Sequence, residues 1–172
     1  MKTSALVVSL VNTIIFISCV ANVSAHWNKF PIYLYKMGTD ANKTDLASTM
    51  VVSLSDRGTS ALVNVHPSRR GVTRYKDIVR IMNVDNYQQY YIGFIVNKAF
   101  DNNALDAAEL IIRDVSTGSL IGTVDLKKSG ATYVPWVITP RGQLRVDLEF
   151  KVSSNSSGTD SASIQLIYSS RD

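Results

Sequence analysis

The two histidines are the residues of this sequence with the clearest potential for metal chemistry. His26 and His66 are the only histidines in the chain of 172 residues. Cleavage of the chain before His26 would place a free α-amine beside its imidazole. Together with the imidazole of His66, these groups would form a histidine brace, whose nitrogen donors suit copper. The alternative is that His66 is an ordinary surface residue, because it follows Val63 and Val65 in a period of two.

The acidic residues give no comparable signal for catalysis. Asp and Glu together number 14 and are scattered along the chain, so no pair indicates the two carboxylates of glycoside hydrolysis. Residues 40–42 and 101–103 are rich in oxygen donors but lack the glycine and terminal glutamate of a calcium loop. No Gly-x-Ser-x-Gly motif is present. Outside the two histidines, the sequence predicts no enzyme activity, no cofactor and no metal site.

The formal net charge of +4 is modest, and the basic residues form one short cluster. Arg69, Arg70, Arg74 and Lys76 surround Tyr75, a combination that also occurs on nucleic-acid-binding surfaces. In a secreted chain, such residues more often form a solvated loop or contact acidic glycans or a neighbouring subunit. We therefore expect neither a nucleic acid nor a small-molecule substrate as a partner.

The N-terminal segment has the three-part layout of a secretory signal peptide. A single lysine precedes a mostly apolar stretch at residues 5–20, and Val23-Ser24-Ala25 supplies small residues for cleavage. We expect residues 1–25 to be removed, although an uncleaved membrane anchor is the alternative. Removal would take away Cys19, the only cysteine, so the mature chain would contain no disulfide.

The rest of the chain has the hydrophobic period of β-strands. From Leu144 to Val152, apolar and charged residues alternate, which predicts one buried and one solvated face. Nine other segments are further strand candidates. The expected strands are residues 30–36, 49–55, 60–66, 75–84, 87–96, 109–115, 119–126, 132–138, 143–152 and 162–168.

Short polar links separate most of these segments. Asp56-Arg57-Gly58, Asp85-Asn86 and Ser116-Thr117-Gly118 are links of hairpin type, and residues 153–161 would join the last two strands in a C-terminal hairpin. Residues 103–113 contain several alanines and could form one short helical turn that leads into a strand. With 45% hydrophobic residues, the chain predicts an all-β fold, an antiparallel β-sandwich of jelly-roll or immunoglobulin-like type.

The segment directly after the cleavage site could pair with another molecule. Phe30, Ile32 and Leu34 share one face of an expected strand, and a loose linker follows at residues 37–45. Such a strand can complete its own sheet or, by strand addition, the sheet of the next molecule. Pro31 removes one hydrogen-bond donor, which disfavours a central position in a sheet.

Two segments carry a resemblance to a known family. Residues 75–84 and residues 90–96, which follow them after the short link Asp85-Asn86, resemble the paired strands of the TasA/camelysin group. The layout is also similar to that of the archaeal bundling pilins of this group, although His26-Trp27 replaces the aromatic-Ser-Asp run of the bacterial members. The resemblance implies an extracellular filament that grows by donor-strand complementation. It places the donor role on Phe30, Ile32 and Leu34.

These observations predict three parts and a leading hypothesis. The parts are a signal peptide at 1–25, an N-terminal donor strand and linker at 26–45, and a β-sandwich domain at 46–172. We expect a secreted structural subunit of a cell-surface pilus, with a role in adhesion or biofilm formation. Its partners would be identical subunits in a head-to-tail polymer, and neighbouring filaments. Asn42 and Asn155 begin glycosylation sequons in polar segments.

Two other function classes remain open from the sequence. One is a copper-binding protein or oxidative enzyme built on His26 and His66. The other is a glycan-binding sandwich in which Trp27, Trp136 or Tyr133 would stack on sugar rings. We expect Trp136 to pack in the core instead, because it lies within an apolar strand.

Overall fold

The computed structural model describes residues 30–36, 50–66, 71–101, 103, 105–153 and 158–171. By compactness the chain divides into Met1–Phe30 and Pro31–Asp172, and every described strand belongs to the second unit. The expected signal peptide at residues 1–25 lies outside the described residues. Within the described ranges, the structure contains no helix with the length and apolar character needed to cross a membrane.

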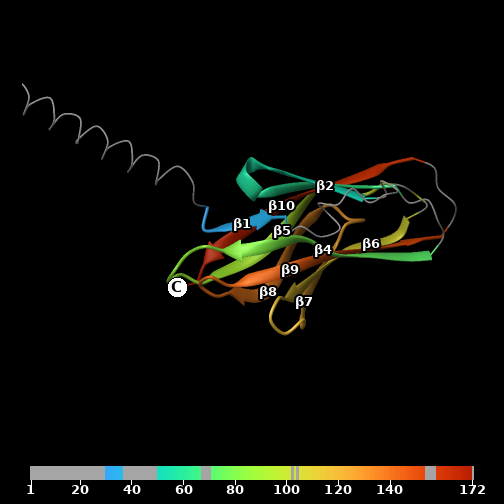
Figure 1. The fold of residues 1–172 in the computed structure, drawn as a ribbon. Helices are drawn as coiled ribbons and strands as arrows, with labels where there is room; N and C mark the ends of the chain where they lie inside the picture. Colours follow the sequence, from blue (N-terminus) through green and yellow to red (C-terminus); the bar gives the residue numbers. More distant parts are fainter. Residues whose placement is uncertain are drawn as a thin grey trace, which may run out of the picture. The chain divides into compact units, whose positions relative to one another are not determined.

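The described part of the second unit contains two five-stranded antiparallel sheets (Figure 1) and one short 3₁₀ helix, η1 (Asp56–Gly58), between β2 and β3. One sheet has the order β1-β4-β9-β6-β7, and the other has the order β2-β3-β10-β5-β8. Each strand overlaps one of the segments that the sequence predicts. The strands are β1 (Ile32–Tyr35), β2 (Met50–Ser55), β3 (Ser60–Val65), β4 (Gly71–Asn83), β5 (Tyr90–Lys98), β6 (Leu105–Asp114), β7 (Leu120–Asp125), β8 (Gly130–Ile138), β9 (Gln143–Val152) and β10 (Asp160–Ser170).

The pairing of the strands follows the nested order of a jelly roll. β3 pairs with β10, β4 with β9, β5 with β8, and β6 with β7. Such wrapping of one long double ribbon into two sheets defines the jelly roll. β1 and β2 lie outside the nested set and extend the sheets, β1 beside β4 and β2 beside β3. The predicted all-β antiparallel sandwich is therefore confirmed.

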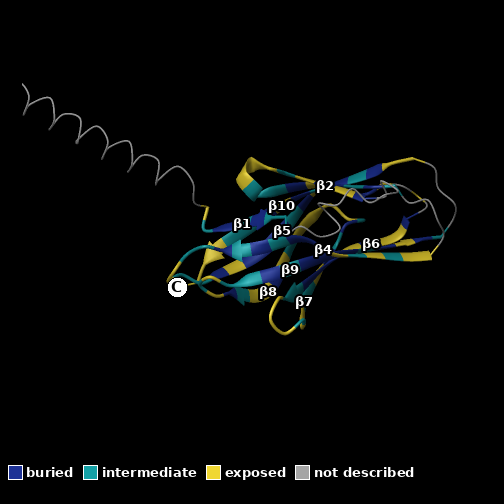
Figure 2. Ribbon diagram, viewed as in Figure 1, coloured by how far each residue is buried: buried dark blue, intermediate teal, exposed yellow. Residues whose placement is uncertain are grey.

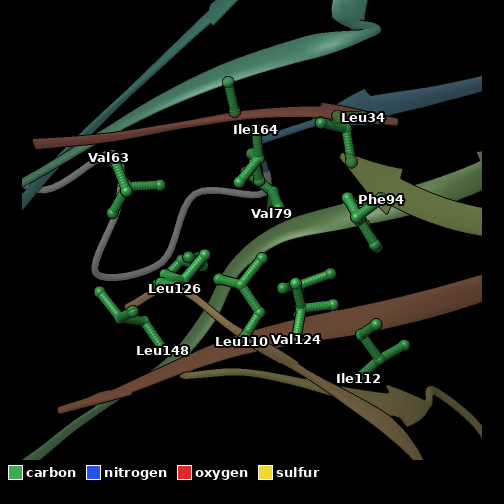
Figure 3. Close-up of a cluster of buried hydrophobic side chains, with 14 of the residues drawn as sticks. Leu34, Val63, Val79, Phe94, Leu110, Ile112, Val124, Leu126, Leu148 and Ile164 are labelled. Atoms are coloured by element: carbon green, nitrogen blue, oxygen red, sulfur yellow. The ribbon is translucent and has the colours of Figure 1, made fainter. Parts of the chain in front are cut away.

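The alternating sequences determine which side chains form the core. Every apolar residue of β9 is buried, and the polar residues between them are less buried except Asp147 (Figure 2). Leu110, Leu148 and Val124 from one sheet, and Val63 and Ile164 from the other, belong to a single buried cluster (Figure 3). Burial of this apolar surface between the two layers is the main stabilising contribution to the fold.

The expected helical turn at residues 103–113 is wrong. Residues 105–114 form strand β6, which pairs with β7 and β9. Ala108, Leu110 and Ile112 are fully buried, and their period of two places all three on the inner face of the sheet. Packing against the opposite sheet therefore outweighs the helix propensity of the alanines.

Two of the expected hairpins are also wrong. β9 and β10 belong to different sheets, so they do not form the expected C-terminal hairpin. Residues 75–84 and 90–96, which resembled paired strands, likewise lie in opposite sheets as parts of β4 and β5. The polar link between them crosses from one layer to the other, because Asp85 accepts the N–H groups of Tyr87 (2.8 Å) and Gln88 (3.0 Å) and bends the chain. The links β2–β3 and β6–β7 are hairpins, as predicted.

Candidate functional site

The first candidate site is the position of β1 at the edge of its sheet. In the single chain, β1 pairs with β4 of the same molecule, and Leu34 lies opposite Ile81. Ile32 and Leu34 are 0% and 2% exposed, whereas Phe30 precedes the strand and is 42% exposed. Two of the three predicted donor residues thus fill the core of their own chain in this structure. Their exchange between subunits stays a prediction.

Polar contacts fix β1 on β4 and its neighbour β9. The backbone N–H of Val84 donates to the carbonyl of Pro31 at 2.9 Å, and the hydroxyl of Tyr35 donates to Oε1 of Gln143 at 2.9 Å. Pro31 directly precedes β1, which is an edge strand. This agrees with the prediction that Pro31, which lacks a backbone N–H group, does not lie in a central strand. The register of β1 is therefore set by both backbone and side-chain contacts.

The turn between β2 and β3 packs directly against β1. Gly58 has a φ of +85°, and a β-carbon at this position would lie 2.5 Å from the carbonyl oxygen of Leu34. A side chain at residue 58 would therefore collide with the backbone of β1. Glycine is required here both for the left-handed conformation and for the close approach.

The second candidate site is an open hollow of about 410 Å³ on the β2-β3-β10-β5-β8 sheet. Residues 91, 93 and 95 of β5 line it, and they alternate with the buried Ile92 and Phe94. The hollow therefore lies on the outer face of the sheet. We call it the tyrosine hollow; its lining residues are Tyr91, Ile92, Gly93, Ile95, Tyr133, Ile167, Tyr168 and Ser169.

Gly93 allows the side chains of Tyr133 and Ile167 to approach each other in the tyrosine hollow. In the register of the sheet, Gly93 lies opposite Tyr133 of β8 and Ile167 of β10. A β-carbon at Gly93 would lie 3.1 Å from Cδ1 of Tyr133 and 3.2 Å from Cγ1 of Ile167. Tyr133 and Ile167 therefore close over the backbone at Gly93 and leave no comfortable room for a side chain there, while Tyr91 and Ile95 line the hollow along β5.

The outer face of the other sheet carries a network of charged side chains. Arg80 donates two hydrogen bonds from Nε, at 3.0 and 3.1 Å, and one from Nη2, at 2.7 Å, to the carboxylate of Asp77. Asp147 is 2% exposed and lies 2.9 Å from Nε of Arg145 and 3.6 Å from Nε of Arg113. The Arg145 Nε contact is an ion pair without hydrogen-bond geometry, whereas its Nη2 donates to Oδ2 of Asp147 at 3.2 Å. The hydrogen bond to Asp77 raises the pKa of Arg80.

This network has the character of a structural element. Each carboxylate is already paired with at least one guanidinium, so neither is placed as an unpaired general acid or base. The network ties β4, β6 and β9 together on the solvent side of their sheet. Arg74, from the predicted basic cluster, joins the same face and donates from Nε to Oε2 of Glu149 at 2.6 Å.

The predicted copper site is only partly within the described residues. His66 follows β3 and is half-buried, while His26 lies outside the described ranges. Among the described residues, no group of three or more His, Cys, Asp or Glu side chains could hold a metal ion. The brace of His26 and His66 stays a prediction, and Asn42 and Asn155, the candidate glycosylation sites, also lie outside the described residues.

Tyr133 and Trp136, two of the aromatic residues of the glycan-binding hypothesis, are both exposed. Tyr133 is 73% exposed and lines the tyrosine hollow. Trp136 is 44% exposed, so the expectation that it packs in the core is wrong. It lies in an irregularity of β8, where the register with β5 shifts and the period of two is interrupted. Trp27 lies outside the described residues.

Sequence reasoning missed Tyr91, Gly93 and Ile167 as members of one site. A glycine inside a strand often marks a close approach of another group, so Gly93 was a usable signal. The sequence does not reveal that Tyr133 and Ile167 are its neighbours, because they come from two other strands.

Comparison with known proteins gives distant likenesses in structure. No known family matches the chain, and no curated protein matches its sequence. The adhesin domain of Epf from Streptococcus pyogenes has a TM-score of 0.41 at 10% identity, with 81% of this chain and 58% of that chain covered. A CBM4 structure has a TM-score of 0.35 at 13% identity, covering 81% and 86% of the two chains.

A third structure, TmCBM61 in complex with β-1,4-galactotriose, has a TM-score of 0.35 at 11% identity, covering 83% of this chain and 90% of that chain. The chain thus spans 58% of the length of the adhesin domain and most of the other two. Likenesses at these scores carry no conclusion about function.

Proposed function

We propose that the protein is a secreted structural subunit of an extracellular filament, in which β1 of each subunit completes the sheet of the next one. The filament would serve adhesion or biofilm formation at the cell surface. The copies are joined head to tail, because the donated strand and the edge of β4 that receives it are different surfaces.

The observation that carries this proposal is the position of β1 in the topology. β1 lies outside the nested pairs of the jelly roll, and among the strands that the structure describes it pairs with β4 alone. Yet its Ile32 and Leu34 are among the most buried side chains of the fold. The sandwich therefore requires a strand at this place, and an identical strand from another copy makes the same contacts.

The chain between β1 and β2 is long enough for such an exchange. Fourteen residues separate Tyr35 from Met50, and a fully extended segment of this length reaches about 50 Å. A strand joined by a linker of this length can stay on its own sheet or move to a neighbouring one, as in domain swapping. Because β1 is covalently linked to its own sheet, its effective concentration there is high and pairing within the chain is favoured. Pairing between molecules requires a high concentration of subunits.

Each junction would be stabilised by burial and by backbone pairing. Full burial of Ile32 and Leu34 contributes about 1.5–3 kcal/mol for each side chain. The register of β1 with β4 runs over four residue pairs, from Ile32 opposite Asn83 to Tyr35 opposite Arg80. These contacts form equally within a molecule and between molecules, so an experiment must identify which copy supplies the strand.

Disulfide trapping makes this distinction. Tyr33 and Met82 lie opposite each other on the outer face, and facing residues of antiparallel strands are close enough for a disulfide bond. One preparation carries Tyr33→Cys and a second carries Met82→Cys, both without Cys19 after export. If subunits exchange β1, the mixed preparations form covalent heterodimers under oxidation, and the double variant gives a ladder of oligomers on a non-reducing gel.

A pair within the jelly roll provides the control. Val72 of β4 and Lys151 of β9 lie opposite each other, so the double variant Val72→Cys, Lys151→Cys gives a cross-linked monomer in either case. A Tyr33→Cys, Met82→Cys variant that yields only cross-linked monomers, in material that forms filaments by electron microscopy, contradicts strand exchange. A secreted protein that forms no filaments contradicts the structural role itself.

A further inference from the structure

We infer that the tyrosine hollow is a binding site for a neutral carbohydrate, with a sugar ring packed against the exposed ring of Tyr133. This site is separate from β1 and does not depend on filament formation. A surface protein with such a site would attach to glycans while its N-terminal strand is engaged elsewhere.

The shape of the hollow is the first argument. Its volume of about 410 Å³ lies within the range of about 300–1,000 Å³ that is usual for small-ligand sites. Tyr133 and Ile167 cover the backbone at Gly93, and Tyr91 and Ile95 line the hollow along β5. A ligand must therefore lie against the side chains of the hollow, because there is no room for it at Gly93 itself.

The position of the hollow within the sheet excludes a peptide that adds as a strand. Gly93 belongs to β5, which is paired with β10 on one side and β8 on the other. The backbone N–H and C=O groups of β5 are therefore engaged in the two ladders, and strand addition requires a free edge. A ligand here must bind through the side chains.

The chemistry of those side chains selects the ligand class. None of the eight lining residues is charged, so the hollow offers no ion pair to a phosphate, a sulfate or a nucleic acid backbone. It combines aromatic and aliphatic surface with the hydroxyls of Tyr91, Tyr133 and Ser169. A sugar ring has the matching pattern, with an apolar C–H face that packs on a tyrosine ring and a rim of hydroxyls that hydrogen-bond.

The exposure of the aromatic walls supports a role in binding. Tyr133 is 73% exposed and Tyr91 is 45% exposed, so neither side chain is needed to fill the core. Isolated exposed apolar residues are common on proteins. Here two tyrosines and two isoleucines converge on a glycine from three adjacent strands, which is the arrangement of a preformed site.

Titration with soluble oligosaccharides tests the inference. The probes are hexamers of β-1,4-linked glucose, mannose and xylose and of α-1,4-linked glucose, added to the ¹⁵N-labelled full chain at up to about 10 mM, which detects millimolar affinities. We expect at least one probe to give saturable shifts of the amides of Tyr91 and Gly93. Tyr133→Ala is expected to weaken that affinity by about tenfold or more, and Tyr133→Phe by less, because it keeps the ring.

Tyr87 provides the matched control. It is 90% exposed and does not line the hollow, so Tyr87→Ala is expected to leave the affinity unchanged. The absence of shifts at Gly93 with all four probes overturns the inference, as does equal affinity in Tyr133→Ala. Self-association that shifts the same amides and is lost in Tyr133→Ala also overturns it, because a second copy of the chain would then be the occupant.

Discussion

Asp77 donates its backbone N–H to Oδ1 of Asp147 at 2.8 Å, so one aspartate holds the backbone of another across two strands. Asp77 has a φ of +57° and lies where the register of β4 with β9 is interrupted, between Tyr75 and Val79. A non-glycine residue in this conformation is strained. The buried carboxylate of Asp147 stabilises the bulge and at the same time pairs with two arginines.

Asp147→Ala is therefore expected to lower the free energy of unfolding by about 2–3 kcal/mol, because the N–H of Asp77 and the guanidinium of Arg145 lose their acceptor. Asp147→Asn keeps an oxygen for the N–H and should lose less. Denaturant titration of the purified variants measures both. Asp106→Ala is the control, because Oδ2 of Asp106 lies 3.8 Å from Nζ of Lys151 in an exposed ion pair. Its free energy of unfolding is expected to change by no more than about 0.5 kcal/mol. Equal stability of Asp147→Ala and the wild type would refute the assigned role.

The link between β4 and β5 gives a pH-dependent contribution to stability. Hydrogen bonds from the N–H groups of Tyr87 and Gln88 lower the pKa of Asp85 below its ordinary value of 3.8. A lowered pKa in the folded state means that the ionised carboxylate stabilises the fold above the ordinary pKa. This stabilisation is lost as the pH falls through the lowered pKa.

Asp85→Ala is accordingly expected to be less stable than the wild type at neutral pH, with a difference that shrinks as the pH falls below about 4. Thermal unfolding of both proteins across the acidic range measures this convergence. Asp101→Ala, at an exposed position outside the strands, serves as the reference and should show no such convergence. A difference for Asp85→Ala that stays constant down to the lowest pH would exclude its carboxylate as the cause.

Alanine substitutions at Gly58 and Gly118 distinguish two contributions to the free energy of unfolding, that of a left-handed backbone and that of a steric clash with β1. Both have positive φ, +85° and +72°, but only a β-carbon at Gly58 meets another group, the carbonyl of Leu34, whereas the space at Gly118 is open. Gly118→Ala is expected to cost about 1 kcal/mol from the backbone conformation alone.

Gly58→Ala should cost more than Gly118→Ala and should act on β1 selectively. Hydrogen exchange followed by mass spectrometry is expected to show faster exchange for residues 32–35 in Gly58→Ala, with the jelly-roll strands unchanged. Equal costs for the two substitutions would show that β1 does not pack on the turn.

Leu34→Ala tests how much the sandwich depends on a strand at the β1 position. Leu34 is 2% exposed, so its truncation leaves a cavity and is expected to cost about 2–5 kcal/mol. Tyr33→Ala is the control on the opposite face of the same strand and should cost less. Chemical denaturation measures both, and a loss below about 1 kcal/mol for Leu34→Ala would indicate that β1 contributes little to the core.

The positions of the strands follow from the sequence because their cause is local. Alternating apolar residues expose one face and bury the other wherever the chain lies, so the ten segments and the burial of Ile32 and Leu34 on one face could be predicted. The same local information wrongly allowed a helical turn at the start of β6, because the buried side chains of this strand have a period of two that alanine propensity obscures.

The pairing of the strands was decided only by the tertiary structure. A short polar link such as Asp85-Asn86 fits a hairpin and also a crossing between sheets, and the choice depends on which layer can bury the next apolar face. For the same reason, the sequence did not bring Gly93 together with Tyr133 and Ile167, or Asp77 with Asp147. The alternation of apolar and polar residues along a strand is a property of neighbouring residues. A site on a sheet depends instead on the register between segments that are far apart in the chain.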